Sequence, residues 1–316
     1  ENAAFPILRQ VVRNKPTNNR AKLAAYQYEN YNKVEFDLNN ITEDFKNRKL
    51  WKSFKFIFDY MDSSGTRPYL PIFMTETLSD VYYRQDPHAK REVIKGSRVS
   101  GIENESIVQF MGDMYQNVNI YENFISIFGK NFISPIADGG KGYYDYLLLD
   151  SNWVEHNWCY RISFKPSHKQ ELAFSGEMWV NDTTFAVRRI DASVPEGTNI
   201  NFVQSFDVHQ EYDMVRPEVY MLTRDELVAD LNVIKDSGER NKNQVQGIFG
   251  RRTASYRDFV INQPKDDAFY AGANEVLVEK DPRSDSESYW LEHRHMELSK
   301  KEAAIYEMVD TLKKVP

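Results

Sequence analysis

Apolar and polar positions alternate along residues 26–38 in the manner of a β-strand. One parity is mainly apolar and the other is charged, with Tyr26, Tyr28, Val34, Phe36 and Leu38 in the first set and Lys33, Glu35 and Asp37 in the second. Because successive side chains of a strand point to opposite faces, this pattern predicts a long strand with one buried face. Residues 5–12 have the apolar spacing of a short helix, which we expect to end at Pro16.

Two further segments have the spacing of amphipathic helices. The first covers about residues 42–61, where Thr42 is a suitable N-cap. The second covers residues 106–128, and its apolar residues step by four and three along one stripe: Ile107, Met111, Met114, Val118, Tyr121, Ile125 and Phe128. We expect this second helix to pack against the concave face of a sheet.

The rest of the chain reads as one strand after another. Weak strand signals at 78–83 and 92–100 are followed by clear alternation from Tyr143 to Val260. Strands that meet at short polar turns, with no helix between them, indicate an antiparallel sheet and exclude a doubly wound parallel one. The predicted class is therefore α+β, with a strongly curved antiparallel sheet that is at least partly closed.

The carboxyl-terminal part, residues 263–316, changes character. It is rich in Pro, Asp, Ser and Glu up to residue 289, which is typical of an irregular connector. Ser299 and Glu302 then form a capping box for a last helix with a narrow apolar stripe. We expect a domain at 1–262, with helical inserts at about 42–61 and 106–128, followed by a loosely held connector and helix in which Trp290 is the anchor.

Composition supports a packed, β-rich protein. Hydrophobic residues make up 41% of the 316 positions, and 19 Tyr and 19 Phe suit half-buried strands. The formal net charge of −7 repels phosphate backbones, so we expect no nucleic-acid partner. No stretch approaches the roughly 18 apolar residues that a membrane-spanning helix needs, and no signal peptide is recognised. Glu1 stands where an initiator Met would be, which suggests a piece of a larger protein.

Motifs that carry chemistry are few. Cys159 is the only cysteine, in an apolar setting that favours a buried small side chain over a nucleophile. Residues 139–142, Gly-Gly-Lys-Gly, lack the spacing of a phosphate-binding or dinucleotide-binding loop. His293 and His295 form the one histidine cluster, and two imidazoles with a nearby carboxylate could meet a metal only if the segment were a strand. We expect no catalytic residue, no metal and no cofactor.

Several segments resemble an uncharacterised outer-membrane family of the Bacteroidetes. The resemblance is carried by Tyr-Gln-Tyr-Glu-Asn-Tyr-Asn-Lys at 26–33, Ile-Ser-Pro-Ile-Ala at 133–137, Phe-Ser-Gly-Glu-Met-Trp-Val-Asn at 174–181, Asn-Ile-Asn-Phe-Val at 199–203 and the closing residues 302–316. It implies a carboxypeptidase-regulatory-like domain before this region and an outer-membrane barrel after it.

The unit formed by Ile-Ser-Phe-Lys-Pro at 162–166 and the hairpin that follows is similar to the strand–turn–strand of LolA-like half-barrels. That resemblance implies a curved antiparallel sheet with helices on its concave face. Long helical inserts at 42–61 and 106–128 could fill the concavity that would otherwise hold an acyl chain.

Three functions follow from these patterns. The first is a non-catalytic cell-envelope module that serves the assembly, gating or cargo recruitment of its own carboxyl-terminal outer-membrane barrel, in the periplasm or at the surface. The second is a binder of a lipid or another apolar ligand, or a partner of another envelope protein, with a concave site lined by Tyr144, Tyr146, Phe174 and Trp179. The third is an envelope hydrolase that uses His293 and His295 or a carboxylate pair.

Overall fold

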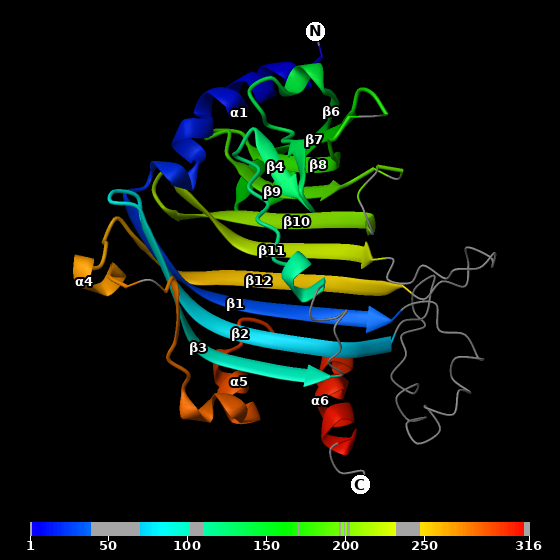
Figure 1. Cartoon of the computed structure of the whole chain (residues 1–316). Helices are drawn as coiled ribbons and strands as arrows, with labels where there is room; N and C mark the ends of the chain where they lie inside the picture. Colours follow the sequence, from blue (N-terminus) through cyan, green and yellow to red (C-terminus); the bar gives the residue numbers. More distant parts are fainter. Residues whose placement is uncertain are drawn as a thin grey trace, which may run out of the picture.

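The fold was established from a computed structural model that describes residues 2–38, 70–101, 110–169, 171–195, 197–198, 200, 203–231, 247–272 and 274–312, the last six by their backbone alone. Eleven strands form one sheet (Figure 1), and its order is β13 (Val276–Val278), β3 (Ala89–Gly101), β2 (Leu70–Arg84), β1 (Ala25–Leu38), β12 (Ile248–Ile261), β11 (Val219–Leu231), β10 (Val203–Arg216), β9 (Val187–Ser193), β8 (Ser175–Asn181), β7 (Asn157–Pro166) and β6 (Tyr144–Val154).

The sheet is mostly antiparallel, as the alternation predicts, but it is open and mixed. β13 pairs in parallel with β3, and β13 and β6 are the two edge strands. The expectation of a partly closed, strongly curled sheet is therefore wrong. The sheet does not need closure to bury its apolar surface, because other segments cover both of its faces.

One face carries the main hydrophobic core. The layer on it consists of α1 (Ala4–Asn18), the segment 110–123 and the hairpin of β4 (Phe124–Ile127) and β5 (Lys130–Ile133), all on the near side in Figure 1. The core residues of this layer include Leu8, Val11, Met114, Ile125, Ile127 and Phe132. α1 confirms the predicted amino-terminal helix and continues past Pro16, which falls in its last turn.

The continuous helix predicted over 106–128 is wrong in its described part. A helical turn covers 110–113, residues 115–119 are extended or irregular, and a β-hairpin begins at Phe124. Phe128 and Gly129 have φ values of 48° and 75°, the left-handed pair that a tight two-residue hairpin requires. Apolar residues spaced by four and three suited a helix, but Ile125 and Ile127 in fact alternate with exposed Phe124 and Ser126. The helix predicted at 42–61 lies outside the described residues.

The remaining elements lie after β12 and contact the sheet. They are α4 (Asp267–Tyr270), β13, the short helix η4 (Pro282–Asp285), α5 (Glu287–His293) and α6 (Lys300–Leu312). Trp290 is fully buried, packs in a cluster with Tyr31 and Leu78, and donates its indole N–H to the Ser284 carbonyl over 2.8 Å. Trp290 is thus confirmed as an anchor. Other parts of the tail also contact the sheet, because β13 pairs with β3 and α6 packs against β2 and β3. The domain boundary at 262/263 stays a prediction.

A network of charged and tyrosine side chains lies between this tail and the sheet. We call it the tail cluster, and it consists of Tyr31, Lys33, Glu35, Glu76, Arg294, Glu302 and Tyr306. The Arg294 guanidinium contacts both oxygens of Glu76, at 2.6 and 2.9 Å, and the Tyr31 hydroxyl donates to the same carboxylate over 2.7 Å. Lys33 pairs with Glu302. Lys33 and Glu35 have the opposite parity from Val34 and Phe36, so the cluster and the main core lie on opposite faces of β1.

Candidate functional site

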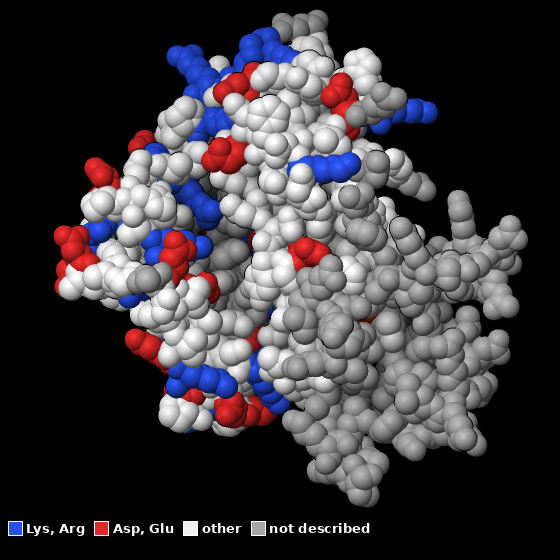
Figure 2. All heavy atoms as spheres, viewed as in Figure 1, with Lys and Arg blue, Asp and Glu red and all other residues white. Residues whose placement is uncertain are grey.

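A cavity of about 370 Å³ opens on the main-core face of the sheet, beside the ends of the central strands (Figure 2). Its walls come from α1, the short helix η1 (Arg20–Lys22), five central strands and β3, and the segment 115–121. Eight of its lining residues are tyrosines, so we call it the tyrosine pocket: Tyr26, Tyr28, Tyr83, Tyr115, Tyr121, Tyr212, Tyr220 and Tyr256.

The tyrosines of β1, β2 and β12 form a wall of contacting rings. The Tyr26 and Tyr83 rings are stacked with centroids 4.6 Å apart, and Tyr28 meets Tyr256 edge to face at 5.2 Å. Ring pairs of this kind add to the stability of each ring's position. Burial raises the pKa of Tyr28 to about 12, so its hydroxyl stays protonated at neutral pH and can donate a hydrogen bond. The wall offers flat ring faces together with hydroxyl donors.

The floor of the pocket is a buried polar network. Asp225 is ion-paired with Arg252 and accepts a hydrogen bond from the Gln210 amide over 3.0 Å. Burial raises the pKa of Asp225, and the charge of Arg252 opposes that rise. The same side chains hold the outer wall: Arg252 donates to the Gln116 carbonyl over 3.2 Å, and Gln210 donates to the Val118 carbonyl over 2.8 Å. Segment 115–119 is therefore fixed to the sheet by side chains rather than by strand pairing.

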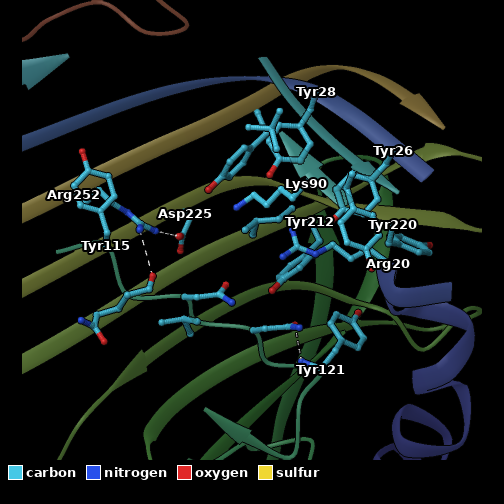
Figure 3. Close-up of a pocket in the computed structure, with 18 of the residues that line it drawn as sticks. Arg20, Tyr26, Tyr28, Lys90, Tyr115, Tyr121, Tyr212, Tyr220, Asp225 and Arg252 are labelled. Atoms are coloured by element: carbon cyan, nitrogen blue, oxygen red, sulfur yellow. Dashed lines mark hydrogen bonds and ion pairs between the residues drawn. The ribbon is translucent and has the colours of Figure 1, made fainter. Parts of the chain in front are cut away.

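Two further cations line the pocket without an acidic partner. The Arg20 guanidinium lies 5.8 Å from the centre of the Tyr26 ring, and Lys90 projects from the start of β3. In the part of the chain that the structure describes, no carboxylate pairs with either side chain, since Asp225 is the pocket's one acidic residue and Arg252 already neutralises it. Figure 3 shows both cations among the tyrosine rings.

The four residues predicted to line a concave site do not lie together in a cavity. Tyr144, Tyr146 and Phe174 are core residues beside the 133–135 backbone, where the Tyr144 hydroxyl donates to the Ile133 carbonyl over 2.6 Å and that of Tyr146 to the Pro135 carbonyl over 2.7 Å. Trp179 has its ring between Arg161 and Arg189 instead. The void beside Phe174 measures about 10 Å³, roughly the space of one water molecule.

The histidine and cysteine candidates are separated as well. His293 contacts the Tyr289 carbonyl at 2.7 Å, whereas His295 contacts Ser255 and Glu29, so the two imidazoles face different partners. Cys159 is fully buried, and burial raises its thiol pKa to about 11, which disfavours a nucleophilic thiolate. Among the described residues no group of three or more metal-ligating side chains is suitably arranged, and no helix is both long and apolar enough to span a membrane.

The sequence did not reveal the pocket as a unit. The alternation pattern predicts Tyr26 and Tyr28 as strand residues. Their pocket partners on β2, β10, β11 and β12 are far away in the sequence, from 55 positions (Tyr28 to Tyr83) to 230 positions (Tyr26 to Tyr256). The available signal was the count of 19 tyrosines, which is high for strands that also need aliphatic packing. That count predicts aromatic surfaces but cannot say which rings converge.

These features define a mostly β protein with one large mixed sheet, few helices and an aromatic, cation-lined pocket. The chain belongs to a family of unknown function, DUF5686, whose family model matches residues 7–246. No curated protein matches the sequence.

Several solved structures are distantly similar to the chain. A DUF1329 family protein from Desulfovibrio piger aligns with a TM-score of 0.33 and 11% identity over 86% of this chain and 98% of that one. A putative outer membrane lipoprotein-sorting protein domain from Vibrio parahaemolyticus aligns with a TM-score of 0.30 and 7% identity over 84% of this chain and 97% of that one. A LolA superfamily protein from Nitrosomonas europaea aligns with a TM-score of 0.24 and 9% identity over 85% of this chain and 97% of that one. These scores are low, and the likeness assigns no ligand.

Proposed function

We propose that the chain is a non-catalytic ligand-binding module of the bacterial cell envelope and that the tyrosine pocket is its binding site. The observation that carries the proposal is the pocket itself, about 370 Å³ in volume and lined by eight tyrosines. Small-molecule sites are concave, aromatic and furnished with a few fixed polar groups, and they begin at about 300 Å³. The ring stacking and the Asp225–Arg252 floor provide those fixed groups.

The pocket favours a compact, partly polar ligand over an acyl chain. Tyrosine hydroxyls, asparagine amides and charged groups line it, whereas the apolar void beside Phe174, on the same face of the sheet, measures about 10 Å³. A long hydrocarbon chain would leave such polar groups without hydrogen bonds, which costs free energy. Carriage of a lipid chain by the half-barrel concavity is therefore the weaker of the two binding functions.

The envelope setting and service to an adjoining outer-membrane barrel remain proposals based on the sequence resemblance. In that setting the pocket would capture a small molecule, and the sheet would present it to a neighbouring domain or protein. Binding alone is sufficient for this role, and no step of it needs a nucleophile or a metal.

Ligand-observed NMR tests the proposal directly. The chain is mixed with a set of small ring compounds, both neutral and charged, and saturation transfer from protein to ligand is recorded. We expect transfer to at least one ring class, and its loss in the variants Tyr83→Ala and Tyr115→Ala. Trp153→Ala is the matched control, because Trp153 is 66% exposed and lies outside the pocket. No transfer to any compound, or equal loss in the control, would contradict the proposed site.

A further inference from the structure

We infer that the tyrosine pocket selects organic anions, with the ring of the ligand lying on the tyrosines and its carboxylate, phosphate or sulfonate held by Arg20 and Lys90. This inference rests on the proposed function, since it names the ligand class of the same site. It goes further in assigning specificity to two side chains that have no acidic partner of their own among the described residues.

The charge of the pocket is opposite to that of the chain. The formal net charge of the whole sequence is −7. The charged residues that line the pocket are Arg20, Lys90 and Arg252 on the positive side and Asp225 on the negative side, which gives a net charge of +2. A cationic hollow in an acidic protein focuses the field on that site and raises the local concentration of small anions. A cationic ligand would be repelled from the same place.

Asp225 does not offset the two free cations. It is 3% exposed, paired with Arg252 and hydrogen-bonded by Gln210, so its charge is used within the floor. Arg252 is 7% exposed, and its other amino group donates a hydrogen bond to the Gln116 carbonyl. The floor is thus close to neutral, and the positive charge that a ligand meets comes from Arg20 and Lys90.

Arg20 is positioned before any ligand arrives. It lies in η1, the short turn between α1 and β1, and the Asn19 side chain caps that turn by accepting the Ala21 N–H over 3.0 Å. The Arg20 carbonyl accepts the Leu23 N–H over 3.0 Å, which closes the turn. Arg20 is half-buried near the Tyr26 ring. The fixed backbone of the turn limits the positions that the guanidinium can reach, and its planar fork matches carboxylate and phosphate oxygens.

The tyrosine wall complements such an anion. Its hydroxyls remain protonated at neutral pH, because burial raises the pKa values of Tyr26 and Tyr28, so they donate rather than compete as negative groups. Their ring faces accept a flat ring in the offset or edge-on arrangements that aromatic pairs prefer. The cavity volume of about 370 Å³ suits a molecule of one to three rings.

A pair of fluorescent probes that differ in charge tests this inference on the full chain. The probes are 1-anilinonaphthalene-8-sulfonate, an anion, and N-phenyl-1-naphthylamine, its neutral counterpart. We expect the anion to bind at least about tenfold more tightly, a difference typical of one charge-assisted contact. Arg20→Gln should weaken the anion about tenfold and leave the neutral probe unchanged, with a further loss in Arg20→Gln/Lys90→Gln. Arg283→Gln is the control, since Arg283 is exposed and does not line the pocket.

The outcomes separate the two proposals. Equal affinity for both probes, each lost in Tyr83→Ala, together with no effect of Arg20→Gln, would overturn the anion selectivity while the binding pocket stands. Binding of neither probe, or binding that Tyr83→Ala and Tyr115→Ala leave unchanged, would contradict the pocket itself. Rising salt should weaken the anion and not the neutral probe, and an unchanged anion affinity in high salt would also count against the inference.

Discussion

The two faces of β1 hold two clusters built from the same residue types, with opposite outcomes. In the tail cluster, Arg294 forms an ion pair with Glu76. Each oxygen of that carboxylate also accepts a hydrogen bond from a tyrosine hydroxyl, one from Tyr31 and the other from Tyr306. In the tyrosine pocket, Arg20 and Lys90 stand among eight tyrosines with no carboxylate opposite them in the described structure. The carboxylate of Glu76 is thus paired within the protein, whereas Arg20 and Lys90 have no carboxylate partner among the described residues.

The difference separates charges that stabilise the fold from charges that we propose bind a ligand. Burying a charge costs several kcal/mol unless another charge and hydrogen bonds satisfy it. In the tail cluster Glu76 is paired with Arg294 and Glu302 with Lys33, and burial beside Glu302 raises the pKa of Glu35. The side chains at the pocket mouth keep contact with solvent, so they can remain unpaired at little cost. If this distinction is right, substitutions at the two clusters should differ sharply in their effect on stability.

The largest effect is expected from Arg294→Ala. The side chain of Glu76 is fully buried, and removal of Arg294 leaves its negative charge without a cation. Breaking a buried pair in this way costs about 3–5 kcal/mol of unfolding free energy, which denaturant titration would measure. Arg283→Ala, at an exposed pair, should cost under about 1 kcal/mol. A loss below about 1 kcal/mol for Arg294→Ala would show that this buried pair does not hold the tail against the sheet.

A smaller effect is expected from pH at His209, on the sheet face opposite the main core. Its ring contacts Asp191 and, at 3.0 Å, Glu211, and these contacts raise its pKa to about 9. Because an unfolded histidine titrates near 6.5, the charged ring stabilises the fold fully below about pH 6.5, and this contribution is lost as pH rises through about 9. Glu226 on β11 lies opposite His209 in the register of the two strands, on the same face as Arg224.

The measurement compares the wild-type chain with His209→Gln at pH 6 and pH 9.5. The stability difference should shrink at the higher pH and should stay under about 1 kcal/mol throughout, because the ion pairs are partly solvated. Titration of the ring by NMR gives the pKa independently. A difference that is the same at both pH values would contradict the assigned protonation.

The smallest effect is expected from Arg20→Gln on stability. Arg20 has no ion pair to lose among the described residues, so the unfolding free energy should change by no more than about 0.5 kcal/mol. Thermal unfolding is sufficient to check this. A loss comparable to that of Arg294→Ala would mean that Arg20 is structural, and it would remove the contrast between the two clusters.

Strand patterning was the part of the fold that the sequence predicted well. Alternation over 26–38 and from Tyr143 to Val260 corresponds to real strands, because one-sided burial leaves a period of two in the sequence. The segment 106–128 misled because its apolar spacing fits a helix and a hairpin alike. Asn117 and Asn119 weaken a helix, and the Phe128–Gly129 turn needs a backbone geometry that the spacing of apolar residues does not report.

The tail and the pocket were missed for a different reason. A narrow apolar stripe predicted loose docking of the last helix, whereas polar contacts fix much of it, such as Lys33 with Glu302. Polar pairs over 200 positions apart leave no periodic trace in the chain. The tyrosine pocket is equally non-local, and only the sheet order brings Tyr26 beside Tyr83 and Tyr28 beside Tyr256.

The hydrogen bonds by which the Arg252 and Gln210 side chains hold segment 115–119 have a consequence for redesign. The anchors hold two carbonyl oxygens, those of Gln116 and Val118, and a carbonyl is present whatever side chain the residue carries. The sheet thus holds the backbone of this segment independently of the side chains at Gln116 and Val118. We expect that Tyr115 and Asn117 can be substituted to reshape the mouth of the pocket while these two contacts keep the segment in place. Asn119 is different, because its side chain also accepts the Tyr121 N–H over 3.2 Å.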